Sequence, residues 1–204
     1  MIKLLIFDFD GTLVNTKKLY YNSIYKHLKE NGIYISKEKF HNELLGLKLH
    51  DILIKLKIRK NLKEIKDKVH ADVFSNIKKI KISKDINCIR NIKIKKIIVS
   101  NTITKHVISI LRKNKINFFQ EIYGGDKFKD KISFIKNYMK KKKLKKNEIA
   151  YIGDMIKDIE IARKVGIISI SISHDISWNS RKELLKANPD YIITNLKEIN
   201  KIIS

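Results

Sequence analysis

Cysteine and proline are almost missing from this chain of 204 residues, which has one of each, Cys88 and Pro189. A single cysteine forms no intramolecular disulfide and leaves no cysteine cluster for structural zinc, so a disulfide-stapled extracellular scaffold is excluded and a cytoplasmic location is expected. Long hydrophobic runs are lacking too. Runs such as residues 4–7 are strand-sized, far below the roughly 18 to 20 residues that span a bilayer, so no membrane partner is expected.

Arginine is also scarce. The net charge is +24, but 40 of the 45 basic residues are lysines, spread over nearly every segment, and only 5 are arginines. Arginine is the residue favoured for bidentate recognition of bases and phosphates. We therefore interpret the charge as a background that attracts anionic substrates, and expect no nucleic-acid partner. A basic nucleic-acid-binding module is the non-enzyme alternative, which predicts affinity that falls steeply with salt.

The apolar pattern alternates between short β-like runs and helical stretches. This alternation predicts an α/β fold with a mostly parallel sheet and helices on both faces. Strands are predicted at 2–8, 95–100, 121–124, 149–153, 167–172 and 191–193, and helices between them at 104–115, 131–143, 157–165, 180–187 and 195–203.

The stretch between the first two strands is too long for one crossover helix, which needs about 10 to 12 residues. It contains an amphipathic pattern stopped by Gly32, a helix expected between Ser36 and Gly46, and further helical patterns. We predict a small helical subdomain at 15–82, inserted into a core of 1–14 and 83–204. The helices expected in and just after it are 16–31, 36–46, 48–57, 62–78 and 84–91.

Acidic side chains follow the first strand. Asp8 and Asp10 are two residues apart and therefore project to the same side of the strand. They lie beyond its carboxyl end, where ligands bind in open α/β sheets. Gly11 allows a sharp turn, and Thr12 offers a hydroxyl donor. A polar turn alone explains the glycine and threonine, but not two acids on a buried strand.

Two later strands bring polar residues to the same edge. Ser100 and Asn101 precede a predicted helix, and helix N–H groups with a serine hydroxyl form a phosphate-sized anion site, although these residues also make an ordinary helix cap. Asp154 ends the strand at 149–153, and Asp158 lies one helical turn later. Four carboxylates in one crevice repel one another unless a hard cation lies among them, and oxygen ligands suit Mg²⁺.

These motifs, in this order, resemble the haloacid dehalogenase superfamily of phosphohydrolases. Its first motif, Asp-x-Asp-Gly-Thr, matches residues 8–12, its second matches Ser100, and its fourth, Gly-Asp-x-x-x-Asp, matches residues 153–158. The third motif is a lysine, placed at Lys131 by its spacing, with Lys129 as the alternative. The resemblance implies a Rossmann-like three-layer α/β/α core, and the insertion resembles the C1-type helical cap of phosphoglycolate phosphatase-like members.

The resemblance implies a Mg²⁺-dependent phosphatase in which Asp8 forms an aspartyl-phosphate and Asp10 transfers protons. It also implies residues that bind metal and phosphate. The metal would be held by Asp8, the backbone carbonyl of Asp10, Asp154 and Asp158, and the phosphoryl oxygens by Thr12, Ser100, Asn101 and Lys131.

The expected substrate is a small phosphorylated metabolite, with 2-phosphoglycolate as the first choice. An inorganic pyrophosphatase, a nucleotidase and a phosphoglucomutase-like phosphotransferase are the alternatives within the superfamily. Lys48 and His50 lie where related caps carry a substrate-facing loop, although exposed polar residues at a helix start are ordinary. A monomer or a homodimer is expected.

Overall fold

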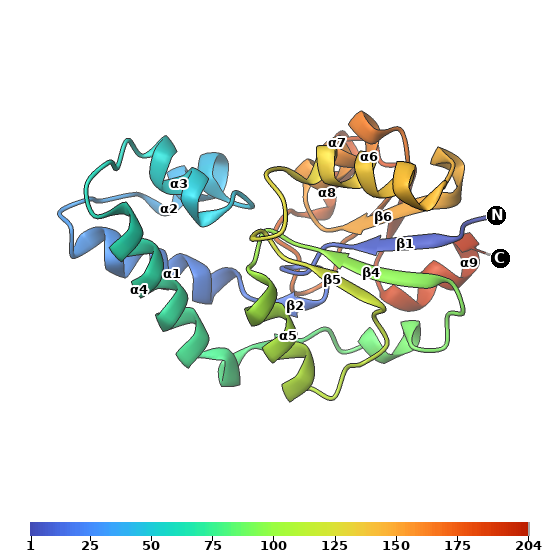
Figure 1. Ribbon diagram of the computed structural model, residues 1–204, viewed down its shortest axis with the longest axis horizontal. Helices are drawn as coiled ribbons and strands as arrows, with labels where there is room; N and C mark the ends of the chain where they lie inside the picture. Colours follow the sequence, from blue (N-terminus) through green and yellow to red (C-terminus); the bar gives the residue numbers. More distant parts are fainter. Residues whose placement is uncertain (204) are drawn as a thin grey trace. The chain divides into compact units, whose positions relative to one another are not determined.

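Six parallel strands form one sheet in the computed structural model, which describes residues 1–203. The strand order is β5-β4-β1-β6-β7-β8 (Figure 1). Their isoleucine-rich sequences suit strands buried on both faces, as parallel sheets require. The strands are β1 (Leu4–Phe7), β4 (Lys95–Val99), β5 (Glu121–Tyr123), β6 (Ile149–Gly153), β7 (Ile168–Ile172) and β8 (Tyr191–Ile193).

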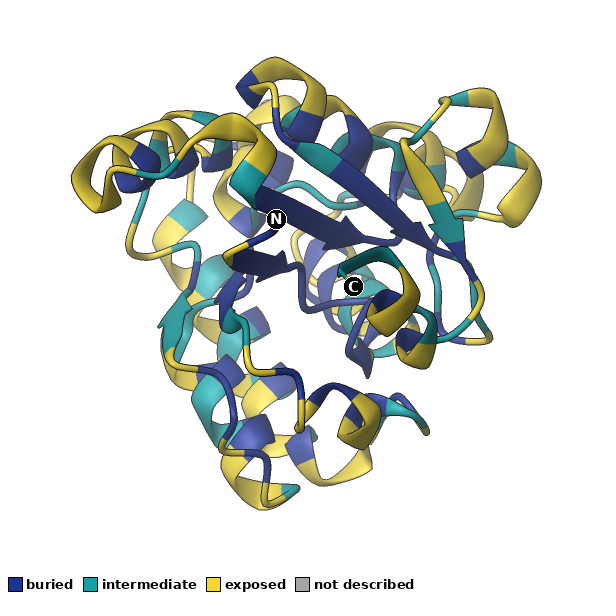
Figure 2. Cartoon of the chain, turned by 90° about the vertical axis from the view of Figure 1, so that its right-hand side faces the viewer, coloured by how far each residue is buried: buried dark blue, intermediate teal, exposed yellow. Residues whose placement is uncertain are grey.

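Helices cover both faces of this sheet, with α6 and α7 on one side and α5 on the other (Figure 1). The central strands are buried along their length, while the helices expose their outer faces (Figure 2). The predicted α/β fold with a parallel sheet is therefore confirmed. The helices of this unit are α5 (Thr104–Lys113), α6 (Lys131–Lys142), α7 (Ile156–Val165), α8 (Arg181–Lys186) and α9 (Ile199–Ile203), with short 3₁₀ segments at Ile86–Ile89, Lys146–Glu148 and Leu196–Glu198.

Residues Thr16–Ile80 form a second compact unit, separate from the unit that contains residues 1–15 and the chain from Lys81 onward. The second unit is helical, and its longest helices bury apolar side chains such as Leu28 and Val69. Its elements are α1 (Lys17–Lys29), α2 (Lys37–Lys39), a π-helical segment at Phe40–Leu44, α3 (Leu49–Lys55), α4 (Leu62–Ser75) and a 3₁₀ turn at Ile77–Lys79.

Three local features differ from the sequence prediction. The helix expected at 36–46 is one α-turn followed by the π-helical segment. The helix expected at 84–91 is the 3₁₀ segment Ile86–Ile89, because its backbone bonds join residues three apart, as from Cys88 N to the Asp85 carbonyl (2.9 Å). The sequence analysis also missed the antiparallel ladder of β2 (Val14–Asn15) and β3 (Lys81–Ile82).

Within the described residues, no helix is both long and apolar enough to cross a membrane. The α-helices that the structure describes are short, and the two longest, α1 and α4, carry charged residues along their length.

Candidate active site

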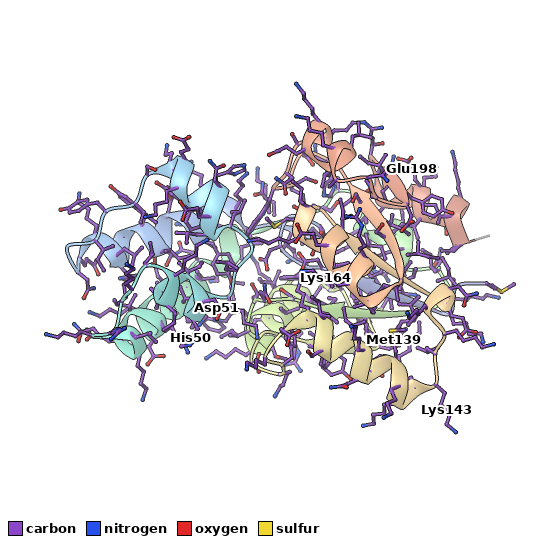
Figure 3. The ribbon with its side chains drawn as sticks, turned by 90° about the horizontal axis from the view of Figure 1, so that it is seen from above. His50, Asp51, Met139, Lys143, Lys164 and Glu198 are labelled. Atoms are coloured by element: carbon purple, nitrogen blue, oxygen red, sulfur yellow. The ribbon has the colours of Figure 1, made fainter. Side chains whose placement is uncertain are left out.

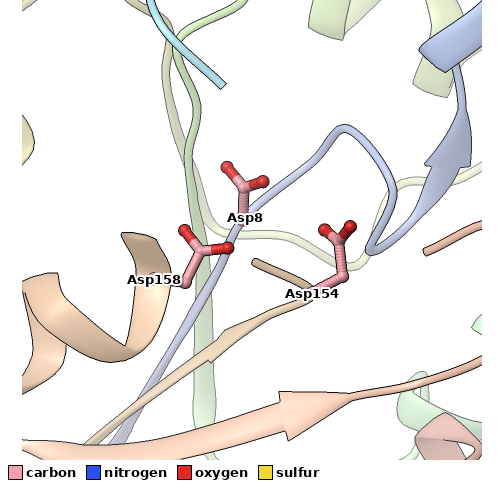
Figure 4. Close-up of side chains that lie close together, drawn as sticks. All are labelled: Asp8, Asp154 and Asp158. Atoms are coloured by element: carbon pink, nitrogen blue, oxygen red, sulfur yellow. The ribbon is translucent and has the colours of Figure 1, made fainter. Parts of the chain in front are cut away.

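Three buried carboxylates lie together at the carboxyl end of the sheet (Figure 4). Asp8 directly follows β1, Asp154 directly follows β6, and Asp158 lies in the first turn of α7. Each offers one oxygen, and these oxygens all lie within 4.8 Å of one another. Such a set of oxygen donors fits a hard divalent cation such as Mg²⁺.

Burial and mutual repulsion raise the pKa of two of these carboxyl groups. For Asp154 the largest cause is desolvation, followed by the charges of Asp158 and Asp8, and hydrogen bonds from Trp178 and Thr12 only partly oppose them. For Asp158 the largest causes are again desolvation and the Asp8 charge. A cation bound among these carboxyl groups would stabilise their charged forms, which burial and repulsion make unfavourable. The raised pKa values and the type of donor atom therefore both fit a cation site.

A lysine lies beside this group. Lys131, the first residue of α6, is buried, and its Nζ donates to Asp8 Oδ1 (2.7 Å) and to the Tyr151 hydroxyl (2.8 Å). The same Nζ lies 3.7 Å from Asp158 Oδ1. Burial opposes the charge of Lys131, but the neighbouring acidic groups outweigh it and raise its pKa. The alternative third-motif lysine, Lys129, is exposed.

Asp10 contacts the loop that follows β4. Its Oδ2 accepts hydrogen bonds from Ser100 Oγ (3.2 Å) and from Thr102 Oγ1 (2.7 Å). The backbone N–H of Thr102 in turn donates to Ser100 Oγ (3.0 Å). Asn101 lies between the two hydroxyl residues and is half-buried. This loop therefore holds the second acid of the first motif, and the binding of metal by the Asp10 carbonyl stays a prediction.

The turn after Asp10 supports Asp154. Thr12 Oγ1 donates to Asp154 Oδ1 (2.8 Å), so Thr12 holds a carboxylate of the candidate metal site. Contact of Thr12 with phosphate stays a prediction. The backbone N–H of Trp178 donates to Asp154 Oδ2 (2.6 Å). Gly11 has φ of +82°, and a Cβ there would overlap the Asp154 carboxylate and the Trp178 ring. This position therefore requires glycine.

The loop after β7 contacts the same turn and the start of α7. The sequence analysis did not predict these contacts. His174 Nε2 lies 2.9 Å from the carbonyl oxygen of Gly11, and because a carbonyl only accepts, this nitrogen carries the hydrogen. Asn179 Oδ1 accepts from the N–H of Ile156, at the start of α7 (3.1 Å). Thr102, Tyr151 and Trp178 are further contacts that the sequence analysis did not assign to the site.

The two residues predicted to contact the substrate, Lys48 and His50, lie in the second compact unit. Lys48 directly precedes α3 and is half-buried, while His50 is exposed in its first turn (Figure 3). Their contact with a substrate stays a prediction.

Comparison with known proteins decides the family. The sequence model described as haloacid dehalogenase-like hydrolase matches residues 5–172. The chain belongs to the haloacid dehalogenase-like hydrolase family. The family resemblance drawn from the motifs is therefore confirmed.

Relatives of this haloacid dehalogenase-like hydrolase include two curated phosphatases. The phosphoglycolate phosphatase of Vibrio parahaemolyticus is 27% identical over 111 residues, which cover 52% of this chain and about half (48%) of that protein. The phosphorylated carbohydrates phosphatase of Thermotoga maritima is 24% identical over 95% of this chain and 98% of its own. A haloacid dehalogenase-like hydrolase structure from Streptococcus pneumoniae superposes with a TM-score of 0.82 at 22% identity, covering 100% and 99% of the chains, which shows the shared fold.

Proposed function

We propose that this haloacid dehalogenase-like hydrolase is a Mg²⁺-dependent phosphatase that acts on a small phosphomonoester. The observation that carries the proposal is the site of Asp8, whose carboxylate contacts the Lys131 ammonium and lies within a group of three buried carboxylates. Asp10 follows two residues later, with its own hydroxyl partners. In this proposal Asp8 is the nucleophile, the three carboxylates form the cation site, and Asp10 transfers protons.

In the proposed reaction, an oxygen of Asp8 attacks phosphorus, and the bond between phosphorus and the leaving-group oxygen breaks. The product is an aspartyl-phosphate, and attack by water on its phosphorus releases inorganic phosphate and restores the Asp8 carboxylate. Asp10 protonates the departing alkoxide and then takes a proton from the attacking water. Ser100 and Thr102 orient Asp10 through the hydrogen bonds to its Oδ2.

Positive charge and hydrogen-bond donors stabilise the phosphoryl oxygens in this proposal. Lys131, the Ser100 hydroxyl and the backbone near Asn101 supply them from the protein, since preorganised donors favour the transition state. The residues that would hold Mg²⁺ are Asp8, the Asp10 carbonyl, Asp154 and Asp158. When bound, Mg²⁺ lowers the repulsion between an anionic carboxylate and an anionic phosphate.

For the substrate we propose 2-phosphoglycolate first, as the name of the Vibrio relative suggests. A sugar phosphate is the second candidate, because the Thermotoga relative, which aligns over nearly all of both chains, is named a phosphorylated carbohydrates phosphatase. We assign the choice between them to the inserted helical unit, with Lys48 and His50 as the first residues to test.

The test is phosphate release by the purified chain from an aryl phosphate, 2-phosphoglycolate, sugar phosphates, nucleotides and pyrophosphate, with Mg²⁺ or with a chelator. We expect Mg²⁺-dependent release that Asp8→Asn lowers at least 1000-fold, on the order of other nucleophile losses. Asp67→Asn, on the exposed side of α4, is the matched control and should keep wild-type turnover.

Wild-type turnover in Asp8→Asn would contradict the aspartyl-phosphate route. Absence of release from every substrate, together with nucleic-acid binding that weakens steeply with salt, would instead support the binding-module alternative.

A further inference from the structure

Tyr151 presents its hydroxyl to the candidate site from inside the core. It lies in the middle of β6, is only 1% exposed, and packs in the cluster that joins the sheet to α6 and α7. A buried phenol requires a polar partner for its hydroxyl. The partner is a residue of the site, because Lys131 Nζ donates to the phenol oxygen (2.8 Å).

In its contact with Lys131 the phenol is the hydrogen-bond acceptor. A phenol has one hydrogen to donate and an oxygen that accepts. Tyr151 therefore joins β6 to the first residue of α6, whose ammonium also contacts Asp8.

The phenol also determines where the ammonium of Lys131 lies. An ammonium has three hydrogens, and two are taken by Asp8 Oδ1 and by Tyr151. Asp158 Oδ1, at 3.7 Å, competes with Asp8 for the same ammonium. With the phenol oxygen gone, the ammonium loses a fixed partner and can move from Asp8 toward Asp158.

We propose that Tyr151 is a positioning residue for catalysis, which holds the Lys131 ammonium against Asp8 so that it is in place for the phosphoryl oxygens. This inference rests on the proposed phosphatase function. It assigns to Tyr151 no contact with substrate and no proton transfer of its own.

Tyr151→Phe tests this role because it removes one oxygen and keeps the ring in the core. The loss of one hydrogen-bond partner is small beside the stability of an ordinary domain, so we expect the variant to fold. Tyr138→Phe is the matched control. Tyr138 belongs to the same core cluster, but its hydroxyl donates to Glu121 (2.9 Å), which is not one of the site residues.

The experiment is a double-mutant cycle of Tyr151→Phe and Lys131→Met, with the kcat and KM of each variant measured under saturating Mg²⁺. We expect Tyr151→Phe to lower kcat about 10-fold or more with little change in KM, as for other losses of a residue that orients a site group. Lys131→Met should lower kcat about 100-fold or more. The double variant should be no slower than Lys131→Met, because the phenol acts through the lysine.

A second double-mutant cycle measures the urea concentration at the unfolding midpoint of each variant in the presence of a chelator. This measurement requires neither bound metal nor turnover. Here too we expect the effects of Tyr151→Phe and Lys131→Met to be non-additive, and those of Tyr138→Phe and Lys131→Met to be additive. An equal fold-loss of kcat from Tyr151→Phe with and without Lys131, in an active wild-type enzyme, would refute the positioning role. Additive shifts of the unfolding midpoint for Tyr151→Phe and Lys131→Met would also refute the positioning role, and this test does not need an active enzyme. Absence of phosphate release from the wild type would by itself contradict only the proposed function.

Discussion

Replacing Lys131 by methionine should destabilise the metal-free protein strongly. The side chains of Lys131 and Asp8 are 7% and 9% exposed, with Nζ and Oδ1 2.7 Å apart, and Asp158 lies 3.7 Å from the same Nζ. Methionine has a similar length and no charge, so it fills the space while leaving the buried carboxylates without their cation. Removing one partner of a buried ion pair typically costs about 3–5 kcal/mol, because the charge that remains stays desolvated.

A divalent cation should return part of this loss. Mg²⁺ bound among the three carboxylates would neutralise the charge that Lys131 no longer balances. A ligand that binds only the folded state stabilises it, and tighter binding gives more stabilisation. We therefore expect the free energy of unfolding of Lys131→Met to be lower than that of the wild type by about 3–5 kcal/mol in chelator. The gain in this free energy on adding Mg²⁺ should be larger for the variant than for the wild type.

Chemical unfolding curves with chelator and with Mg²⁺ measure both quantities. Lys129→Met is the matched control, since Lys129 is exposed two residues away, and its curves should follow those of the wild type. Equal stability of Lys131→Met and wild type in chelator would refute the reasoning, as would identical Mg²⁺ effects on the two proteins.

Three further variants test other parts of the site and fold. Gly11 has φ of +82° and lies against the Asp154 carboxylate, so Gly11→Ala should displace this carboxylate. The Mg²⁺ concentration that gives half-maximal turnover should then rise at least 10-fold, and an unchanged Mg²⁺ titration would contradict this. Thr102→Val removes a donor to Asp10 and should lower kcat about 10-fold, with recovery in Thr102→Ser; failure of serine to restore kcat would count against an orienting hydroxyl. The pKa of Glu121 is lowered from 4.5 to about 2 by Lys95 and two tyrosine hydroxyls, against the opposing desolvation. Its charge therefore stabilises the fold above pH 4.5, by up to about 3 kcal/mol, and this stability is lost as the pH falls toward 2. Glu121→Gln should reduce the fall in the free energy of unfolding between pH 4.5 and 2, measured from unfolding curves at each pH. The same fall in the variant and the wild type would contradict the assignment.

The parallel sheet could be predicted because its strands carry strong signals. The strands Ile149–Gly153 and Tyr191–Ile193 have the bounds that their apolar runs predict. The ladder of Val14–Asn15 and Lys81–Ile82 could not be predicted in this way, since two residues show no periodicity and the pairing depends on segments far apart in sequence. The sequence does not distinguish the 3₁₀ segment at Ile86–Ile89 from an α-helix, because four residues are too few to separate the two periods.

The acids of the candidate site could be found from the sequence because they end strands in a spaced pattern. Their partners could not. Tyr151 looks like any aromatic residue of a buried strand, and Thr102 like part of a helix cap. The donor that Trp178 offers to Asp154 is its backbone N–H, which every residue except proline has. Such contacts depend on how the loops pack, and residue type alone does not indicate them.

The short ladder between β2 and β3 also bears on how the family diversifies. Val14 pairs with Ile82 and Asn15 with Lys81, so the chain leaves the catalytic unit and returns to it at neighbouring residues. The entropic cost of joining two adjacent ends rises only slowly with the length of the chain between them. The whole of Thr16–Ile80 can thus be lengthened, shortened or exchanged in evolution while the register of the sheet and the four site aspartates stay in place. With substrate choice assigned to this unit, as proposed above, new substrates would arise by replacing one inserted segment while the reaction chemistry is inherited unchanged.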